Sequence, residues 1–269
     1  MWSLKNWLRR RYLARTRIDH RLWRDVCSPL HLLDGLTGEE HGRLRQLTLL
    51  FRREKALEPI GDLVLDETMR LTLAAQAALP VLNLGIDWYE GWRSVIVYPD
   101  EFIADHDEMD GAGVVHRVRE ARAGESWQRG PLVLAWSDIE TGGEPDGNNV
   151  IIHELAHKID SLNGPADGFP PLHRGMSAKE WHAAFSSAYA ELGARVARGE
   201  PTEIDPYAAH SPAEFFAVLS EAFFELPSLL RQNHGELYRQ LSLFYRQDPA
   251  ARTVRRSRGH LGQRPLQGA

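Results

Sequence analysis

The stretch "NNVIIHELAHKIDSLNG", residues 148–164, decides the fold because it joins an apolar helical pattern to two histidines four positions apart. The pattern predicts a helix over residues 149–162, ended by the turn-forming pair Asn163-Gly164. On such a helix His153 and His157 project from one face, so both rings can direct a nitrogen at one zinc ion roughly 2.0–2.1 Å away. The stretch therefore predicts two of the three protein ligands of a catalytic zinc site.

A glutamate directly follows the first histidine of the pair. Glu154 lies about 100° further around the helix, so it is not a third ligand on that face. It is placed beside the open position of the metal, where coordination lowers the pKa of a water from about 15.7 to about 7. We therefore expect Glu154 to act as the general base.

The His-Glu-x-x-His pattern is by itself only moderate evidence, because a pair of structural histidines can produce it. Its context strengthens it, since an apolar strand precedes the helix and zinc peptidases lay their substrate along such a sheet edge. The other faces of the helix carry apolar side chains that can be buried, namely Ile151, Ile152, Leu155, Ala156 and Ile159. We therefore favour the catalytic interpretation.

The usual continuations of this pattern are absent. The metzincin extension requires glycine and histidine where this chain has Asp160 and Asn163. A thermolysin-like glutamate about twenty residues downstream would be Glu180, which we expect to be the capping-box partner of Ser177. The third ligand must therefore lie further along the chain.

Two glutamates remain, on a helix predicted over residues 211–226 with Ser211 as its N-cap. Glu214 and Glu221 are seven positions apart and so share one face of an otherwise aromatic helix. The alternatives are that Glu214 only caps the helix and that Glu221 is solvated, and the residues alone leave the ligand choice open. Whichever is not the ligand, like Asp160, can accept the second N–H of a ligand histidine.

The rest of the chain predicts an α+β fold, a mainly helical zincin-like metallopeptidase with a small β-sheet and the HExxH helix in its active site. Further helices are expected over 36–57, 66–79 and 177–199, and strands over 92–99 and 130–136. We expect one domain over 1–250, with a helical N-terminal lobe over 1–85 and a catalytic core over 86–250. A basic tail over 251–269 is expected to be disordered.

Composition limits the remaining classes. Cys27 is the only cysteine among 269 residues, so a disulfide framework and a thiolate zinc site are both excluded. A formal net charge of -5 gives no attraction to nucleic acid, and no segment resembles a signal peptide or a membrane span. We therefore expect a cytoplasmic protein without a membrane anchor. The alternatives for the basic N-terminus are a membrane-surface helix and a terminal helix packed on the protein itself, and the interrupting polar residues favour the second. That helix is expected to pack four apolar side chains, namely Trp2, Leu4, Trp7 and Leu8.

Five longer motifs carry a resemblance to a known family. They are "YPDEF" (98–102), "GPLVLAW" (130–136), "DGNNVIIHELAHKIDSLNG" (146–164), "DPYAAHSPAEFFAVLSEAFFE" (205–225) and "LFYRQDP" (243–249). Over most of residues 20–250 the chain resembles the Mlc titration factor A family, cytoplasmic zinc metallopeptidases related to the catalytic domain of anthrax lethal factor. These motifs are far more specific than the five-residue signature alone.

The resemblance implies one zinc ion per chain, held by His153, His157 and Glu214, with Glu154 as the general base. It also implies that Tyr207, seven positions before Glu214, faces the site. A neutral phenol there can donate a hydrogen bond to the oxyanion of the reacting carbonyl without competing for the metal.

The resemblance further implies aminopeptidase-type cleavage of small apolar N-terminal residues and binding to a DNA-binding, sugar-responsive repressor. We separately expect the protein to be a monomer. The alternative is a non-catalytic, zinc-stabilised module that sequesters a transcription repressor. Glu154 argues against that alternative, because a purely structural zinc site has no use for a base and normally has a fourth protein ligand. Hydrolysis of a non-peptide amide is a third possibility.

Overall fold

A computed structural model describes residues 4–100, 105–109, 115–119, 130–141 and 145–252 of the chain. Of the tail predicted from residue 251, it describes only Ala251 and Arg252, and the rest lies outside the described residues. None of the helices in these ranges has the length and apolar character needed to cross a membrane.

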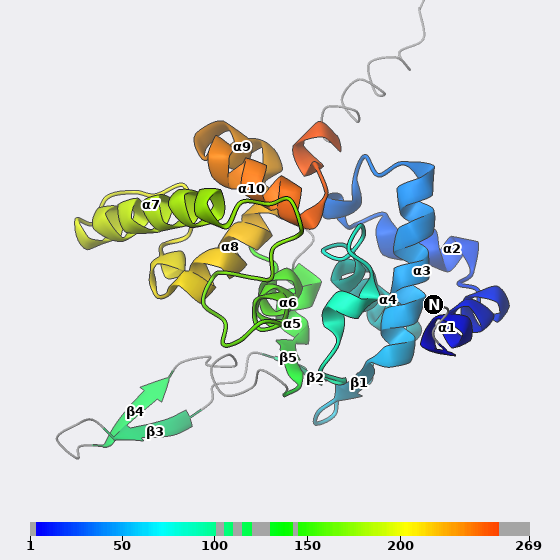
Figure 1. The fold of residues 1–269 in the computed structure, drawn as a ribbon. Helices are drawn as coiled ribbons and strands as arrows, with labels where there is room; N and C mark the ends of the chain where they lie inside the picture. Colours follow the sequence, from blue (N-terminus) through cyan, green and yellow to red (C-terminus); the bar gives the residue numbers. More distant parts are fainter. Residues whose placement is uncertain (1–3, 101–104, 110–114, 120–129, 142–144, 253–269) are drawn as a thin grey trace, which may run out of the picture.

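The described residues are mostly helical with a small β-sheet, as predicted, and the structure shows that the main sheet is parallel (Figure 1). The helices are α1 (Leu4–Arg15), α2 (His20–Cys27), η1 (His31–Leu33), α3 (Gly38–Glu54), α4 (Glu67–Ala78), η2 (Ile86–Tyr89), α5 (Trp136–Thr141), α6 (Val150–Asp160), α7 (Ala178–Ala197), η3 (Pro206–Ala209), α8 (Pro212–Glu225), α9 (Pro227–Asn233) and α10 (Gly235–Tyr245). The strands are β1 (Ala56–Pro59), β2 (Ser94–Tyr98), β3 (Asp105–Met109), β4 (Val115–Arg119) and β5 (Leu132–Ala135).

The main sheet has the order β1-β2-β5 with all pairs parallel, and β3 pairs with β4 in a separate antiparallel sheet. The two strands predicted over 92–99 and 130–136 are confirmed as β2 and β5. The helix predicted over 36–57 is too long, because α3 ends at Glu54. The next residues form β1, in which the Ala56 N–H donates to the Arg93 carbonyl at 2.8 Å. Pairing with β2 thus overrides the helical periodicity at this point.

Helix α6 lies at the centre of the described fold. In Figure 1 the N-terminal helices α1–α4 lie on one side of it and α7–α10 on the other. It contacts α4, α8 and β5. Its apolar positions are buried as predicted, namely Ile151, Ile152, Leu155, Ala156 and Ile159. Because every residue of α8 from Phe215 to Glu225 is also buried, the two helices form a rigid pair.

The N-terminal helix forms, but it does not pack in the predicted way. Three of the four apolar residues expected to be covered are exposed, namely Leu4, Trp7 and Leu8, and Trp2 lies outside the described residues. The buried residue of α1 is Arg9, whose guanidinium binds Glu54 and Asp87, each at 2.6 Å. The apolar stem of an arginine covers the protein surface while its charged end is paired, and this arrangement orients α1.

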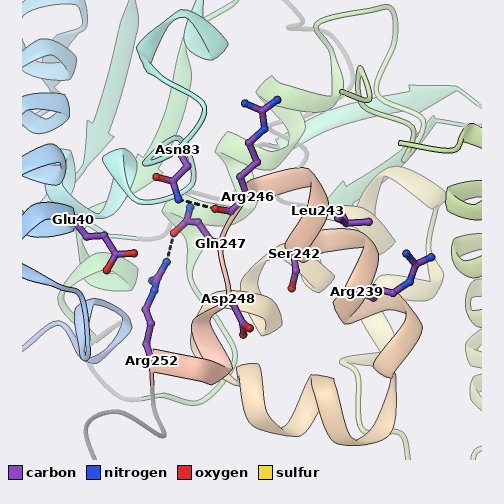
Figure 2. Close-up of a pocket in the computed structure, with 9 residues that line it drawn as sticks. All are labelled: Glu40, Asn83, Arg239, Ser242, Leu243, Arg246, Gln247, Asp248 and Arg252. Atoms are coloured by element: carbon purple, nitrogen blue, oxygen red, sulfur yellow. Dashed lines mark hydrogen bonds between the residues drawn. The ribbon is translucent and has the colours of Figure 1, made fainter. Parts of the chain in front are cut away.

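The end of α10 is joined to the end of α4 beside a hollow of about 460 Å³ (Figure 2). The Asn83 amide donates to the Arg246 carbonyl at 2.6 Å, and the Gln247 amide donates to the Leu79 carbonyl at 2.8 Å. Arg252 in turn donates to Gln247, and in Figure 2 it points toward that residue while the Arg246 side chain extends away. The arginines of this hollow therefore do not converge on a common point.

A glycine in the loop after α6 makes a close approach to the start of α8. Gly168 has φ +78°, and a Cβ added there would lie 2.5 Å from the Pro212 carbonyl oxygen. Its N–H donates to Asp160 Oδ2 at 2.7 Å, and its carbonyl accepts from the Trp181 indole at 3.2 Å. This loop therefore sets where α8 begins relative to α6.

We expect Gly168→Ala to lower the free energy of unfolding by about 2–4 kcal/mol for two reasons. The alanine would be strained at a positive φ, and its Cβ would overlap the Pro212 carbonyl oxygen. Urea denaturation measures the change. Gly164→Ala is the matched control, since no atom lies within 4 Å of a Cβ at that position, and it should shift stability by less than about 1 kcal/mol. Equal effects of the two substitutions would contradict the packing argument.

Candidate metal centre

Helix α6 brings the two predicted histidines together. Asn149 caps the helix, its side-chain oxygen accepting the Ile152 N–H at 3.1 Å. One turn apart on this helix, His153 Nε2 and His157 Nε2 lie 3.2 Å from each other. Both side chains are mostly buried, at 15% and 13% exposure, so their orientation is fixed by packing.

The third group comes from the first turn of α8. Glu214 Oε2 lies 3.0 Å from His153 Nε2 and 3.4 Å from His157 Nε2. The Ser211 hydroxyl accepts the Glu214 N–H at 3.1 Å, so the cap uses the backbone of Glu214 and leaves its carboxylate for the histidines. His153, His157 and Glu214 are thereby the group that could hold a metal ion within the described ranges.

The spacing of these three atoms fits a zinc ion. Bonds of roughly 2.0–2.1 Å in a tetrahedron place ligand atoms about 3.3–3.4 Å apart, close to the 3.0–3.4 Å found here. Buried Glu214 Oε2 has no hydrogen-bond partner within the described part of the chain, although it faces two ring nitrogens. A cation at the common point would satisfy all three atoms.

Glu221 lies on the opposite side of the first histidine. Its Oε1 is 2.7 Å from His153 Nδ1, and its Oε2 accepts the Asn149 backbone N–H. The side chain is 8% exposed. Glu221 therefore stands outside the three-atom cluster and fixes the ring whose other nitrogen points into it.

The charged side chains of the centre shift one another's pKa values. Burial lowers the pKa of His153, but the carboxylates of Glu214 and Glu221 outweigh burial and raise that pKa to about 10. Burial would raise the pKa of Glu214, yet the two adjacent imidazoles bring it below its ordinary value. Without a cation the centre therefore holds a proton on His153.

Glu154 has a different environment from the other carboxylates of the centre. Burial raises its pKa above the ordinary value, although the charges of His153 and His157 act in the opposite direction. A carboxylate whose pKa is shifted toward neutrality is better matched to moving protons at neutral pH than an ordinary surface glutamate.

Tyr207 lies on η3, at the mouth of the centre. Its ring centroid is 6.2 Å from that of His153, and the residue is 45% exposed. The Asp205 side chain accepts the Tyr207 N–H at 2.8 Å and so caps this short helix. His153, Tyr207 and Glu221 line a pocket of about 400 Å³ together with three aspartates, Asp138, Asp146 and Asp205.

Two other acidic candidates lie away from the cluster. Asp160, considered as a partner of a ligand histidine, instead accepts the Gly168 N–H at 2.7 Å. Glu180 donates its N–H to the Ser177 hydroxyl at 3.2 Å, which is one half of the predicted capping box. Its carboxylate binds Arg239 at 2.7 Å, so the other half of the box is not the interaction that forms. Neither is positioned to bind the same ion.

The helix cap Asn149 and two further residues are features that the sequence reasoning missed. The Asn149 amide donates to Gln76 at 2.8 Å and to Glu225 at 2.9 Å, and all three residues are buried. Glu225 could have been noticed, because it lies four positions after Glu221 on an otherwise apolar helix. No sequence signal pointed to Gln76.

Known proteins are similar in sequence to most of this chain. The profile of the family described as "Glucose-regulated metallo-peptidase M90" matches residues 4–246. A protein of Yersinia enterocolitica is 40% identical over 237 residues, covering 87% of this chain and 88% of its own. One of Pectobacterium atrosepticum is 40% identical over 234 residues, covering 86% and 87%, and one of Escherichia coli is 39% identical over 237, covering 87% and 88%. All three are named "Mlc titration factor A".

Proposed function

The chain belongs to the M90 family of glucose-regulated metallopeptidases, and we propose that it is a zinc-dependent peptidase of aminopeptidase type. The observation that carries the proposal is the convergence of His153 Nε2, His157 Nε2 and Glu214 Oε2, whose charges act on Glu154. Two imidazoles and one carboxylate are a ligand set that catalytic zinc uses, and they leave one coordination position open.

Three residues of the chain have separate roles in the proposed reaction. When bound, zinc supplies an acidified water and a positive charge beside the substrate carbonyl. Glu154 accepts the proton that the attacking water releases and passes it to the nitrogen of the leaving amine. Tyr207 donates its phenolic O–H to the oxygen on which negative charge develops. Glu221 holds His153 by Nδ1, so that Nε2 remains directed at the centre.

The pocket beside His153 supports the aminopeptidase type. Asp138, Asp146 and Asp205 line it, and no lysine or arginine does so within the described residues. A concave site lined by carboxylates favours a positively charged group, and the α-ammonium of a peptide lies next to the first scissile bond. A free N-terminus is therefore the substrate feature that this pocket is suited to bind.

N-acetylation of a substrate should lower kcat/KM by about 10–100-fold, because it removes a charge-assisted contact of about 1.5–3 kcal/mol. Alanine 4-nitroanilide and its N-acetyl form provide the comparison, with release of nitroaniline as the measurement. Equal turnover of both would contradict the aminopeptidase type while leaving the peptidase assignment intact.

Zinc affinity should depend on pH in a defined direction. Because the pKa of His153 is raised to about 10, zinc must displace its Nε2 proton at neutral pH, and this competition weakens as pH rises. We expect the apparent affinity to increase about tenfold per pH unit between about pH 7 and pH 9. Competition titration with a chelator of known affinity measures the slope, and a pH-independent affinity would contradict this account.

We also propose that the chain binds a DNA-binding repressor, a role separate from hydrolysis. The support is the name "Mlc titration factor A" of relatives that align with 86–87% of this chain. Fluorescence anisotropy of labelled repressor DNA, with and without this protein, tests it. If the protein is only a sequestering module, wild type and Glu154→Gln will both release the repressor and neither will cleave peptides.

A further inference from the structure

Asn149 makes more hydrogen bonds than its position as a helix cap requires. Its side-chain oxygen accepts the Ile152 N–H at 3.1 Å, and its amide nitrogen donates to Gln76 Oε1 at 2.8 Å and to Glu225 Oε1 at 2.9 Å. Its backbone N–H donates to Glu221 Oε2. The residue is 4% exposed, so each of these groups would be costly to leave unpaired.

These bonds explain why this cap is an asparagine. Capping needs only one acceptor, which serine, threonine or aspartate supplies equally well. The other helices in the described residues with a side-chain cap use those types, namely Asp19, Thr37, Asp66, Ser177, Asp205 and Ser211. Asparagine alone among common caps adds two N–H donors to the acceptor, and two buried oxygens receive them here.

The network ends on a side chain of the candidate metal centre. The Glu221 carboxylate is held at one oxygen by the Asn149 N–H and at the other by His153 Nδ1, at 2.7 Å. A planar carboxylate held at both oxygens has little freedom to rotate, and it sets the plane of the imidazole. A shift of Asn149 would therefore turn the ring that directs Nε2 into the cluster.

We propose that Asn149 is a positioning residue for the metal centre, which it orients through Glu221 and His153. Gln76 and Glu225 hold its amide, and Gln76 carries that support to α4, a helix that bears none of the candidate ligands. The proposal rests on the proposed function in one respect, namely that His153 binds the metal.

Asn149→Asp separates positioning from capping. The substitution keeps the side-chain acceptor for the Ile152 N–H, but it replaces the amide nitrogen that carries both donors with one oxygen that faces Gln76 and Glu225. We expect zinc affinity to fall by about 10–100-fold, the usual effect of losing an outer partner of a ligand. The visible spectrum of the cobalt-substituted protein should change as well, because it reports ligand geometry.

A second substitution should restore the network with its direction reversed. In Asn149→Asp/Glu225→Gln the new amide donates to the new carboxylate, and the formal charge equals that of wild type. Gln76 Nε2, which has no hydrogen-bond partner within the described residues, can donate to that carboxylate after the amide rotates. We expect the double variant to recover wild-type zinc affinity and cobalt spectrum to within about threefold.

The matched control is Ser177→Ala, which removes the cap of α7, whose hydroxyl accepts the Glu180 N–H at 3.2 Å. It should cost about 1 kcal/mol of stability and leave zinc affinity unchanged. Gln76→Leu removes a partner of the Asn149 amide from α4, without changing α6 or α8. It should lower zinc affinity by about 3–10-fold.

The outcomes separate the two proposals. Wild-type protein that binds no zinc would refute the proposed function. Wild-type protein that binds zinc, with folded Asn149→Asp or Gln76→Leu of unchanged affinity and cobalt spectrum, would overturn the positioning role alone. The positioning role would also be overturned if the folded double variant did not regain zinc affinity. If Asn149→Asp does not fold, Gln76→Leu and the double variant decide the question.

Discussion

Glu154→Gln is expected to retain zinc and fold normally while lowering kcat/KM toward peptide substrates by about 10²–10⁴-fold. The amide has nearly the shape of the carboxylate, but it cannot accept the proton that the attacking water must lose. Removing a half-buried carboxylate whose pKa is raised by desolvation also relieves that cost, so the metal-free protein should not lose stability. Metal analysis, thermal unfolding and turnover on one preparation give the three readouts.

Glu191→Gln is the matched control for this experiment. Glu191 is exposed on α7, and the same chemical change there should leave kcat/KM within about twofold of wild type. If zinc-loaded Glu154→Gln turned over peptides as fast as wild type, Glu154 could not be the general base. Loss of zinc by that variant would instead place Glu154 among the ligands, which its position on α6 does not favour.

The sequence predicted the central helices well because their signals are local. Ser177 and Ser211 cap α7 and α8 as predicted, and apolar residues at helical spacing are buried. Residues 56–59 show the limit of such reasoning. Their conformation is decided by pairing with β2, a segment almost forty residues away, and no local pattern carries that information.

The exposed face of α1 has a similar explanation. An apolar stripe predicts burial only if a complementary surface is available. Here the side of α1 that faces the rest of the protein carries Arg9, which is buried and donates to the Glu54 carboxylate. Which side of a terminal helix faces inward depends on such long-range ion pairs. The spacing of its apolar residues therefore could not settle the packing.

The candidate centre was predictable up to the choice between two glutamates. Seven residues correspond to nearly two helical turns, so Glu214 and Glu221 share a face and differ by about 10 Å along the axis of α8. Only the placement of α8 against α6 decides which one meets both histidines. Gly168 contributes to that placement through its contact with Pro212, and the sequence gives no sign of such a contact.

Glu214→Ala should lower zinc affinity by about 10²–10³-fold, and Glu221→Ala by a smaller factor of about 10–100. Zinc sites with apparent binding free energies of about 10–16 kcal/mol over four ligands gain roughly 2.5–4 kcal/mol from each. Glu214 Oε2 is 3.0 and 3.4 Å from the two ring nitrogens, whereas Glu221 reaches only His153 Nδ1. The first substitution therefore removes a ligand, while the second leaves all three in place and loosens one.

Competition titrations of both variants against one chelator, at one pH, measure the difference directly. The free energy of unfolding should rank the two variants in the opposite order, with the larger loss of stability in Glu221→Ala. Glu221→Ala leaves the buried Asn149 N–H without an acceptor, at a cost of about 1–3 kcal/mol, whereas Glu214 accepts no backbone N–H in the described residues. A larger loss of affinity in Glu221→Ala than in Glu214→Ala would reverse the roles and move the metal toward Nδ1 of His153. Placing Glu221 beside both Nε2 atoms instead would require α8 to slide by about two turns past α6, which the close packing of Phe215, Phe216 and Leu219 opposes.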